Sequence, residues 1–153
     1  MLYAFYIYTR NGSCLYHKIW NSGKSTSSNE QEEMERLLFG LLFSLKEFVN
    51  KIAPSSGHEE VGTGYLGKCE SLHRYQTTTY ICHQYETSSG FRFILLSDTH
   101  SGDLSSVLRH IYTNIFVEYV MNNPLYDPHA VKTIDNQLFQ SHLMQYLEGL
   151  PCY

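Results

Sequence analysis

The sequence has few charged residues and no excess of basic ones. Lys and Arg total 11 and Asp and Glu total 15 in 153 residues, so 17% of the chain is charged, against about 25% in a typical soluble domain. The formal net charge of −4 argues against a protein that coats nucleic acid, because affinity for phosphates needs a surplus of Lys and Arg. We therefore expect no nucleic acid among the partners.

Long apolar runs and lipidation motifs are also missing. The first apolar run, Leu2 to Tyr8, has no basic stretch before it and no small-residue cleavage site after it, and it is far shorter than the ~20 residues of a membrane-spanning helix. Position 2 is Leu and position 150 is Leu, where myristoylation and prenylation need Gly and Cys. Without a signal peptide, we expect the 4 Cys to be reduced thiols in a cytosolic protein.

In place of charge the sequence has aromatic residues: 13 Tyr, 8 Phe and 1 Trp. A chain of ~150 residues can bury about 70% of the surface that its unfolded form exposes. With 42% apolar residues, a disordered chain is excluded. We predict a single folded domain over residues 1–153.

The pattern of apolar residues and turns predicts eight elements in the order β-β-α-β-β-β-α-α. Strands are expected at residues 3–8, 14–20, 69–76, 80–86 and 91–97, and helices at 30–53, 104–122 and 135–148. Asn29 and Glu32 are spaced as a capping box at the start of the first helix. The strands at 3–8 and 91–97 are almost entirely apolar, as in strands covered on both faces. We therefore predict an α+β fold, a three-layer sandwich whose five-stranded antiparallel sheet has the first helix on one face and the last two on the other.

Two glycine-containing motifs resemble nucleotide-binding loops but lack the required context. Ser22–Thr26 looks like the end of a P-loop, yet Lys18 stands where that motif needs Gly. Gly62–Gly67 fits G-x-G-x-x-G but precedes an expected strand, whereas a dinucleotide-binding loop follows a strand and opens a helix. We expect a flexible polar loop at Ser22–Thr26 and a mobile loop over residues 55–67.

The residue types of a metal or catalytic site are present but poorly arranged. Cys69, His73, Cys82 and His83 are the best set for zinc, but neighbours in a strand point to opposite faces and cannot easily bind one metal. No Ser or Cys pairs with a His in a recognisable catalytic pattern. We therefore predict no catalytic residues, no metal and no cofactor.

The first long helix carries apolar residues on two sides. At ~100° per residue, one stripe is expected to face the core; it contains Met34, Leu37, Leu38, Leu41, Leu42, Leu45, Phe48, Val49 and Ile52. Phe39 and Phe43 fall on the opposite side, and Gly40 and Ser44 leave a notch beside them. We predict a partner interface at Arg36, Phe39, Gly40, Phe43, Ser44 and Glu47; the alternative is that a long loop covers the two Phe.

The last two helices also show apolar stripes. In the helix at 104–122 the expected core residues are Leu104, Val107, Leu108, Ile111, Tyr112, Ile115 and Tyr119, with Glu118 just inside the stripe. Outside the stripe lie Val117, Val120 and Met121, and the alternative for some of these three is packing on the last helix. In the last helix they are Phe139, Leu143, Tyr146, Leu147 and Leu150.

Several segments together resemble a known family. They are Asn11–Cys14, Leu38–Leu45, Tyr85–Gly90, Leu96–Asp98, Val107–Tyr112 and Asn122–Leu125. In this order and spacing they resemble the sybindin-like family, the small longin-type subunits of the TRAPP vesicle-tethering complex. The resemblance spans nearly the whole chain and is weakest over residues 54–75. It departs from the family at Thr9, where an acidic residue is usual.

The resemblance implies a longin-like fold and a non-enzymatic subunit of a guanine nucleotide exchange factor for the Rab GTPase of ER-to-Golgi transport. The implied partners are a second longin-type subunit, the palmitate-binding α/β subunits and the Rab itself. The implied location is cytoplasmic and peripheral at Golgi and endoplasmic reticulum membranes, through the complex. The alternatives are a longin-type small chain of an adaptor complex or another trafficking scaffold and, as an enzyme, a nucleotide-binding protein that uses Ser22–Thr26.

Overall fold

A computed structural model describes residues 1–20, 27–53, 71–127 and 133–153. The chain divides into two compact units. One consists of Met1–Ser27 with His73–Tyr153 and contains the sheet and the C-terminal helices; the other, Ser28–Leu72, contains the first helix. The single domain expected over residues 1–153 stays a prediction.

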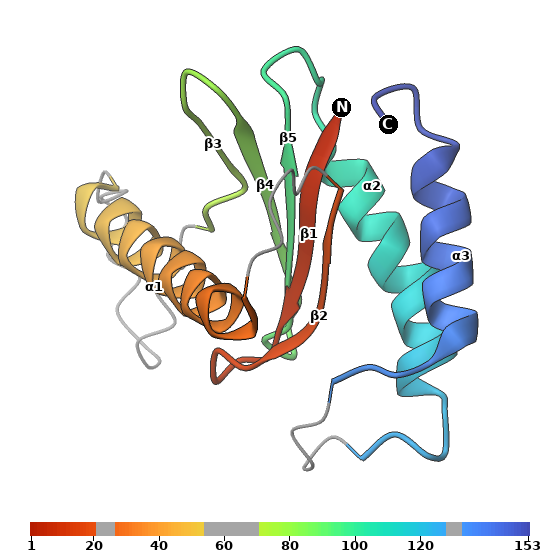
Figure 1. Cartoon of the computed structure of the whole chain (residues 1–153). Helices are drawn as coiled ribbons and strands as arrows, with labels where there is room; N and C mark the ends of the chain where they lie inside the picture. Colours follow the sequence, from red (N-terminus) through yellow and green to blue (C-terminus); the bar gives the residue numbers. More distant parts are fainter. Residues whose placement is uncertain (21–26, 54–70, 128–132) are drawn as a thin grey trace, which may run out of the picture. The chain divides into compact units, whose positions relative to one another are not determined.

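The first unit is built on one antiparallel five-stranded sheet (Figure 1). Its strands are β1 (Leu2–Tyr8), β2 (Cys14–Ile19), β3 (Arg74–Gln76), β4 (Ile81–Glu86) and β5 (Arg92–Ser97). The order β2-β1-β5-β4-β3 places β1 beside β5 in the interior of the sheet, where a strand covered on both faces is expected. Phe5 pairs with Leu95, and Tyr6 with Ile94. All four are buried, so side chains on both faces of these strands are covered, and the α+β fold is confirmed.

Two hairpin turns meet at one end of the sheet. Gly12 has a φ of 89° and Gly90 a φ of 93°, a left-handed conformation that L side chains rarely adopt. A Cβ at Gly90 would also lie 2.8 Å from Cβ of Arg10. Glycine at position 90 therefore serves both the turn and the close approach of the neighbouring hairpin.

A β-bulge in β2 changes which of its residues face the core. Ile7 pairs with Tyr16 whereas Tyr8 pairs with Cys14, so Leu15 is an extra residue in the strand. As a result the consecutive Leu15 and Tyr16 both pack into the same hydrophobic core.

The C-terminal helices pack on one face of the sheet (Figure 1). They are α2 (Ser105–His110), the π-helix η1 (Ile111–Met121) and α3 (Gln137–Glu148). Aromatic rings join the layers: the centroids of Phe93 and Phe116 are 5.1 Å apart, and those of Tyr16 and Phe139 are 5.4 Å apart. Buried Phe139, Leu143 and Leu147, with partly buried Tyr146 and Leu150, confirm the stripe predicted for the last helix.

The helix predicted over 104–122 is not a single α-helix. After α2, hydrogen bonds in η1 close over five residues, as shown where the Asn122 N–H donates to the Val117 carbonyl at 2.9 Å. π-helices are rare and usually no longer than one turn, which is why the apolar pattern alone predicted an α-helix.

The π-helix explains three errors in the predicted core. Its wider turn brings residues four and five apart to the same side, so the buried positions are Ile111, Ile115, Phe116 and Val120. Phe116 was missing from the predicted stripe, and Val120 was wrongly placed outside it. Glu118 is exposed rather than inside the core. The rest of that stripe is buried or packed against the core.

The second unit contains α1 (Ser28–Ile52). The helix begins before Asn29, so Asn29 is a helical residue and the predicted capping box is wrong. A position for this helix on the opposite face of the sheet stays a prediction.

Within the described ranges, no helix is both long and apolar enough to cross a membrane. The P-loop-like segment Ser22–Thr26, the glycine-rich Gly62–Gly67 and the predicted loop 55–67 lie outside the described residues, as does Cys69.

Candidate functional site

The predicted interface residues lie along α1. Arg36, Gly40, Phe43, Ser44 and Glu47 are exposed, whereas Phe39 is partly buried. The prediction of two exposed Phe is therefore wrong for Phe39 and confirmed for Phe43, whose side chain is 50% exposed. Their role as a partner interface stays a prediction.

Gly40 marks open surface in the middle of this helix. A Cβ built at Gly40 would meet no described atom within 4 Å, so packing among the described residues does not require glycine there. Glycine inside a helix costs about 1 kcal/mol relative to Ala. Gly40 leaves a notch at the helix surface that a side chain of another protein could fill.

The stripe predicted as the core face of α1 is only partly buried. Leu42 is buried and Leu38, Leu45 and Val49 are partly buried. The other five members, Met34, Leu37, Leu41, Phe48 and Ile52, are exposed. The stripe thus contains both covered and exposed side chains, and the expectation that it faces the core stays a prediction.

Helix geometry joins the exposed residues into one continuous surface. With Met34 at 0° and ~100° per residue, the five exposed members of the stripe span about 300° to 360°. Ser44 and Gly40 follow at about 280° and 240°, and Phe43 lies at about 180°. We call these eight residues, with Arg36 and Glu47 between Phe43 and Gly40, the outer surface of α1.

The width of the apolar arc could have revealed this surface from the sequence. A helix that buries one face needs an apolar stripe of about 100°. From Phe39 at about 140°, back through Met34, to Leu37 at about 300°, the apolar residues of α1 cover roughly twice that arc. An apolar arc of that width is more than one buried face of a helix needs, so it indicates a second apolar face on α1.

Charges contribute little to this surface. The Arg36 guanidinium lies 3.5 Å from a carboxylate oxygen of Glu32, one turn away. Exposed pairs of this kind contribute about 0.3–0.5 kcal/mol. The outer surface of α1 is therefore suited to bind an apolar protein surface by burial rather than by ion pairing.

The residues considered for zinc do not form a site among the described residues. Cys82 and His83 are neighbours in β4. The His83 Nε2 lies 3.1 Å from Oγ of Ser97, and burial lowers the His83 pKa. Burial raises the pKa of Cys82 to about 12, although a hydrogen bond from Tyr75 acts in the opposite direction. At neutral pH and without a metal ion, the Cys82 side chain is therefore a neutral thiol and a poor nucleophile.

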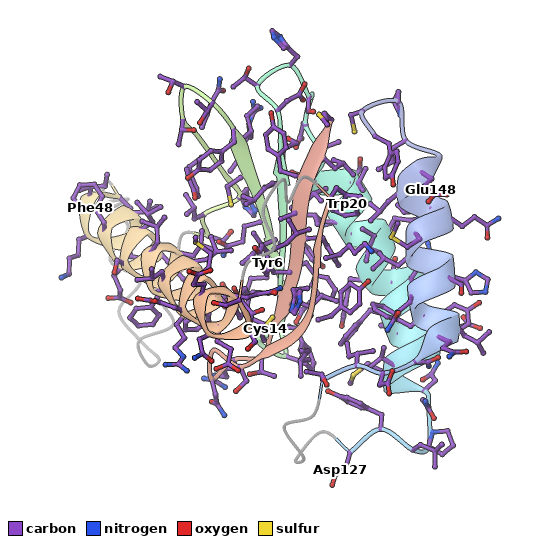
Figure 2. All side chains as sticks on the ribbon, in the orientation of Figure 1. Tyr6, Cys14, Trp20, Phe48, Asp127 and Glu148 are labelled. Atoms are coloured by element: carbon purple, nitrogen blue, oxygen red, sulfur yellow. The ribbon has the colours of Figure 1, made fainter. Side chains whose placement is uncertain are left out.

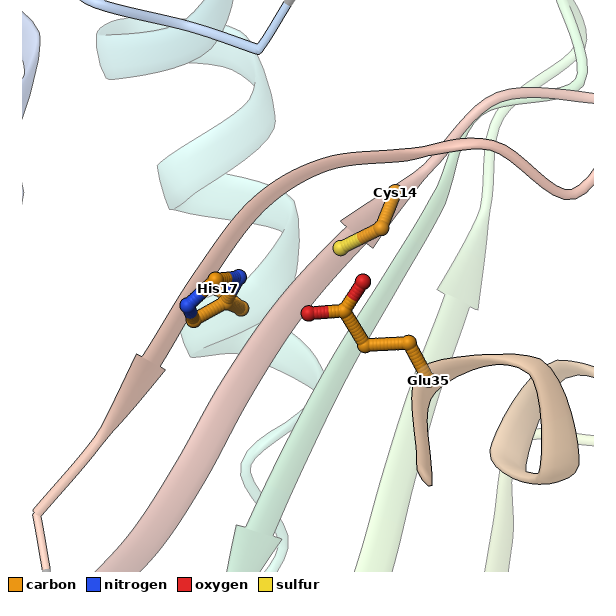
Figure 3. A group of neighbouring side chains, drawn as sticks. All are labelled: Cys14, His17 and Glu35. Atoms are coloured by element: carbon orange, nitrogen blue, oxygen red, sulfur yellow. The ribbon is translucent and has the colours of Figure 1, made fainter. Parts of the chain in front are cut away.

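The bulge in β2 places Cys14 and His17 on the same side of that strand (Figure 3). Their potential ligand atoms lie within 4.8 Å of one another. Glu35, also drawn there, belongs to α1 and therefore to the other unit. Zinc uses three or four protein ligands, so the pair on β2 alone does not define a metal centre.

Comparison with known proteins identifies related sequences along the whole chain. Residues 2–150 match the Sybindin-like family. "Trafficking protein particle complex subunit 1" of Dictyostelium discoideum is 39% identical over 153 residues, covering 100% of this chain and 99% of the relative. The protein of the same name from Homo sapiens is 34% identical over 148 residues, covering 97% of this chain and 92% of the relative.

A more distant relative carries a different subunit number. "Trafficking protein particle complex subunit 4" of Pongo abelii is 27% identical over 115 residues, covering 74% of this chain and 46% of the relative. The sequence is thus similar to proteins named as two different subunits of one complex.

Proposed function

Because the chain belongs to the sybindin-like family, we propose that it is a core subunit of a TRAPP vesicle-tethering complex. The support is the similarity to proteins named subunit 1, which extends over nearly the full length of both chains. The observation that carries the proposal in the structure is the exposed apolar outer surface of α1, because an apolar face of this extent is typical of a protein that works in an assembly.

In this proposal the chain has no active site of its own. It helps to form a platform that exchanges guanine nucleotide on the Rab GTPase of ER-to-Golgi transport. Exchange requires a surface that binds the nucleotide-free GTPase more tightly than the nucleotide-bound form, since a partner can shift an equilibrium only by its difference in affinity for the two states. This mechanism needs no general acid, base or metal from the chain.

The proposed partners are the other TRAPP subunits and the Rab. They include a second longin-type subunit and the palmitate-binding α/β subunits. Similarity to a protein named subunit 4 supports a complex that contains chains of related sequence. We place the protein in the cytoplasm, held peripherally at Golgi and endoplasmic reticulum membranes through the complex.

An adaptor-complex small chain is the second candidate, because it has the same fold class. A pull-down from cells with the tagged full-length chain separates the two. TRAPP subunits and a Rab in the bound fraction support our proposal, whereas large chains of a clathrin-type coat support the adaptor.

The outer surface of α1 is tested by Phe43→Glu and Leu41→Glu in the full-length chain. Both side chains are exposed, so each substitution should leave the thermal unfolding of the isolated chain unchanged. A buried carboxylate without a partner is costly, so we expect recovery of the complex in co-purification to fall at least about tenfold. Gln145→Glu, at an exposed position of α3, adds the same charge elsewhere and should leave recovery unchanged.

Normal assembly and exchange by both α1 variants would show that this surface is not an interface. Loss of assembly by Gln145→Glu as well would show that added charge, rather than the α1 surface, is responsible.

A further inference from the structure

A second exposed apolar feature lies at the end of η1, in the turn Asn123–Tyr126. The Tyr126 N–H donates to the Asn123 carbonyl at 3.0 Å, and the Leu125 N–H donates to the Asn123 side chain at 3.0 Å. Asn followed by Pro124 is a preferred start for a type I turn. Tyr126 packs against the core, whereas Leu125 is 91% exposed. A turn with fixed geometry thus presents Leu125 away from the protein.

Leu138 lies beside this turn, in the first turn of α3, and is also exposed. Its position is fixed by Asn136, which accepts hydrogen bonds from the N–H groups of Leu138 and Phe139 at 3.0 and 3.4 Å. The same side chain donates to the Tyr119 carbonyl of η1 at 2.7 Å. The start of α3 is therefore linked to the end of η1, and both leucines are presented by hydrogen-bonded backbone.

A cavity of about 630 Å³ opens between these elements. Leu125, Tyr126 and Leu138 contribute apolar surface, and the carboxylates of Glu118, Asp127 and Asp135 lie around it. No Lys or Arg is among its described lining residues. The π-helix contributes directly, because its register exposes Glu118 rather than burying it in the core.

We infer that this cavity is a docking site for a segment of another protein that carries an apolar side chain flanked by Lys or Arg. The apolar side chain would cover Leu125 and Leu138, and the basic side chains would face the carboxylates of Glu118 and Asp135. Charge complementarity of this kind selects partners and orients them. The inference does not depend on the proposed function, because it rests only on the cavity and its rim.

The same charges argue against other occupants. Nucleic acid and anionic membranes would be repelled by the carboxylates. A second copy of this chain carries the same acidic rim and a net charge of −4, so self-association through this face brings like charges together.

Photo-crosslinking in cells can identify the occupant. Leu138 in the full-length chain is replaced by p-benzoylphenylalanine, and crosslinked peptides are sequenced by mass spectrometry. We expect a partner peptide with an apolar residue and at least about two Lys or Arg within one helical turn of it. A synthetic copy of that peptide should then bind the purified chain, with Leu125→Ser and Glu118→Lys each raising Kd about tenfold.

Glu148→Lys is the matched control. Glu148 is exposed at the far end of α3 from Asp127 (Figure 2), and this substitution makes the same change in charge, so Kd should not change. Circular dichroism checks that each variant is folded. If Glu118→Lys does not fold, salt dependence replaces it as the test. The Kd of the peptide for the wild-type chain should rise with salt concentration, because salt screens exposed charges. Three crosslinking results would overturn the inference. They are a crosslinked partner peptide that is neutral or acidic, a crosslink to residues 128–132 of the same chain, and no crosslink at all.

Discussion

The Asn136 side chain joins α3 to the backbone of Tyr119 in η1. Its amide N–H donates to the Tyr119 carbonyl at 2.7 Å, while its oxygen caps the first turn of α3. A single side chain therefore starts one helix and fixes that start to the end of another.

Substitution of Asn136 should separate these two effects. Asn136→Ala removes the cap and leaves the Tyr119 carbonyl without its donor, so the free energy of unfolding should fall by about 2–3 kcal/mol. Asn136→Ser keeps a capping oxygen and removes the amide donor to Tyr119, so the loss should be smaller. Urea unfolding of the three proteins measures both effects; equal losses for the two variants would contradict this assignment.

The π-helix register makes opposite predictions for two valines. Val120 is 2% exposed, so Val120→Ala should lower the free energy of unfolding by about 2 kcal/mol. Val117 is only partly buried, so Val117→Ala should lower it by less than about 1 kcal/mol. Similar small losses at both positions in urea unfolding would favour the α-helical register, which puts both residues outside the core.

His83 should make stability depend on pH. Burial, and to a smaller extent the charge of Arg74, lowers the pKa of His83, while Asp103 acts in the opposite direction. Below the unfolded pKa of about 6.5, the unfolded chain binds a proton that the folded chain resists binding. The free energy of unfolding should therefore fall as pH drops through this range, and the His83 contribution should be constant above it.

Urea unfolding at two pH values, one above and one below 6.5, measures this dependence. His83→Gln should reduce it, whereas His100→Gln, at an exposed position, should leave it closer to that of the wild type. An unchanged pH dependence in His83→Gln would show that other groups cause it.

Cys82 should be unreactive in the folded protein. Its side chain is fully buried and burial raises its pKa to about 12, so very little thiolate is present at pH 8. Alkylation by iodoacetamide, followed residue by residue with mass spectrometry, should be at least about a hundredfold slower at Cys82 in the native protein than in urea. Rapid labelling of native Cys82 would show that β4 opens readily.

Much of the fold could be predicted because its signals are local. The Asn11-Gly12 pair, a strong local signal for a hairpin turn, lies between β1 and β2. The apolar residues of β1 and β5 predicted two strands covered on both faces, and these strands are the inner neighbours β1 and β5 of the sheet. The π-helix could not be predicted, since Phe116 and Val120 enter the core only when hydrogen bonds close over five residues, and the apolar pattern does not reveal that change.

The candidate sites were predicted less completely, because exposure depends on what the rest of the chain covers. Phe43 and Gly40 were found from helix rotation alone. Leu41 and Phe48 were assigned to the core because they are apolar; both side chains are exposed, and their contact with the sheet stays a prediction. Leu125 was noted only within a family motif, and its exposure follows from the turn at Asn123, which sequence periodicity does not describe.

Nucleotide exchange by a reconstituted TRAPP complex, prepared with and without this chain, tests the central proposal most directly. The measured quantity is the rate of fluorescent GDP release from the Rab of ER-to-Golgi transport. We predict that omission of the chain abolishes stimulation, that addition of the wild-type chain restores it, and that the Phe43→Glu variant restores at most about a tenth of the wild-type rate. Full stimulation by a complex assembled without the chain would contradict the proposal.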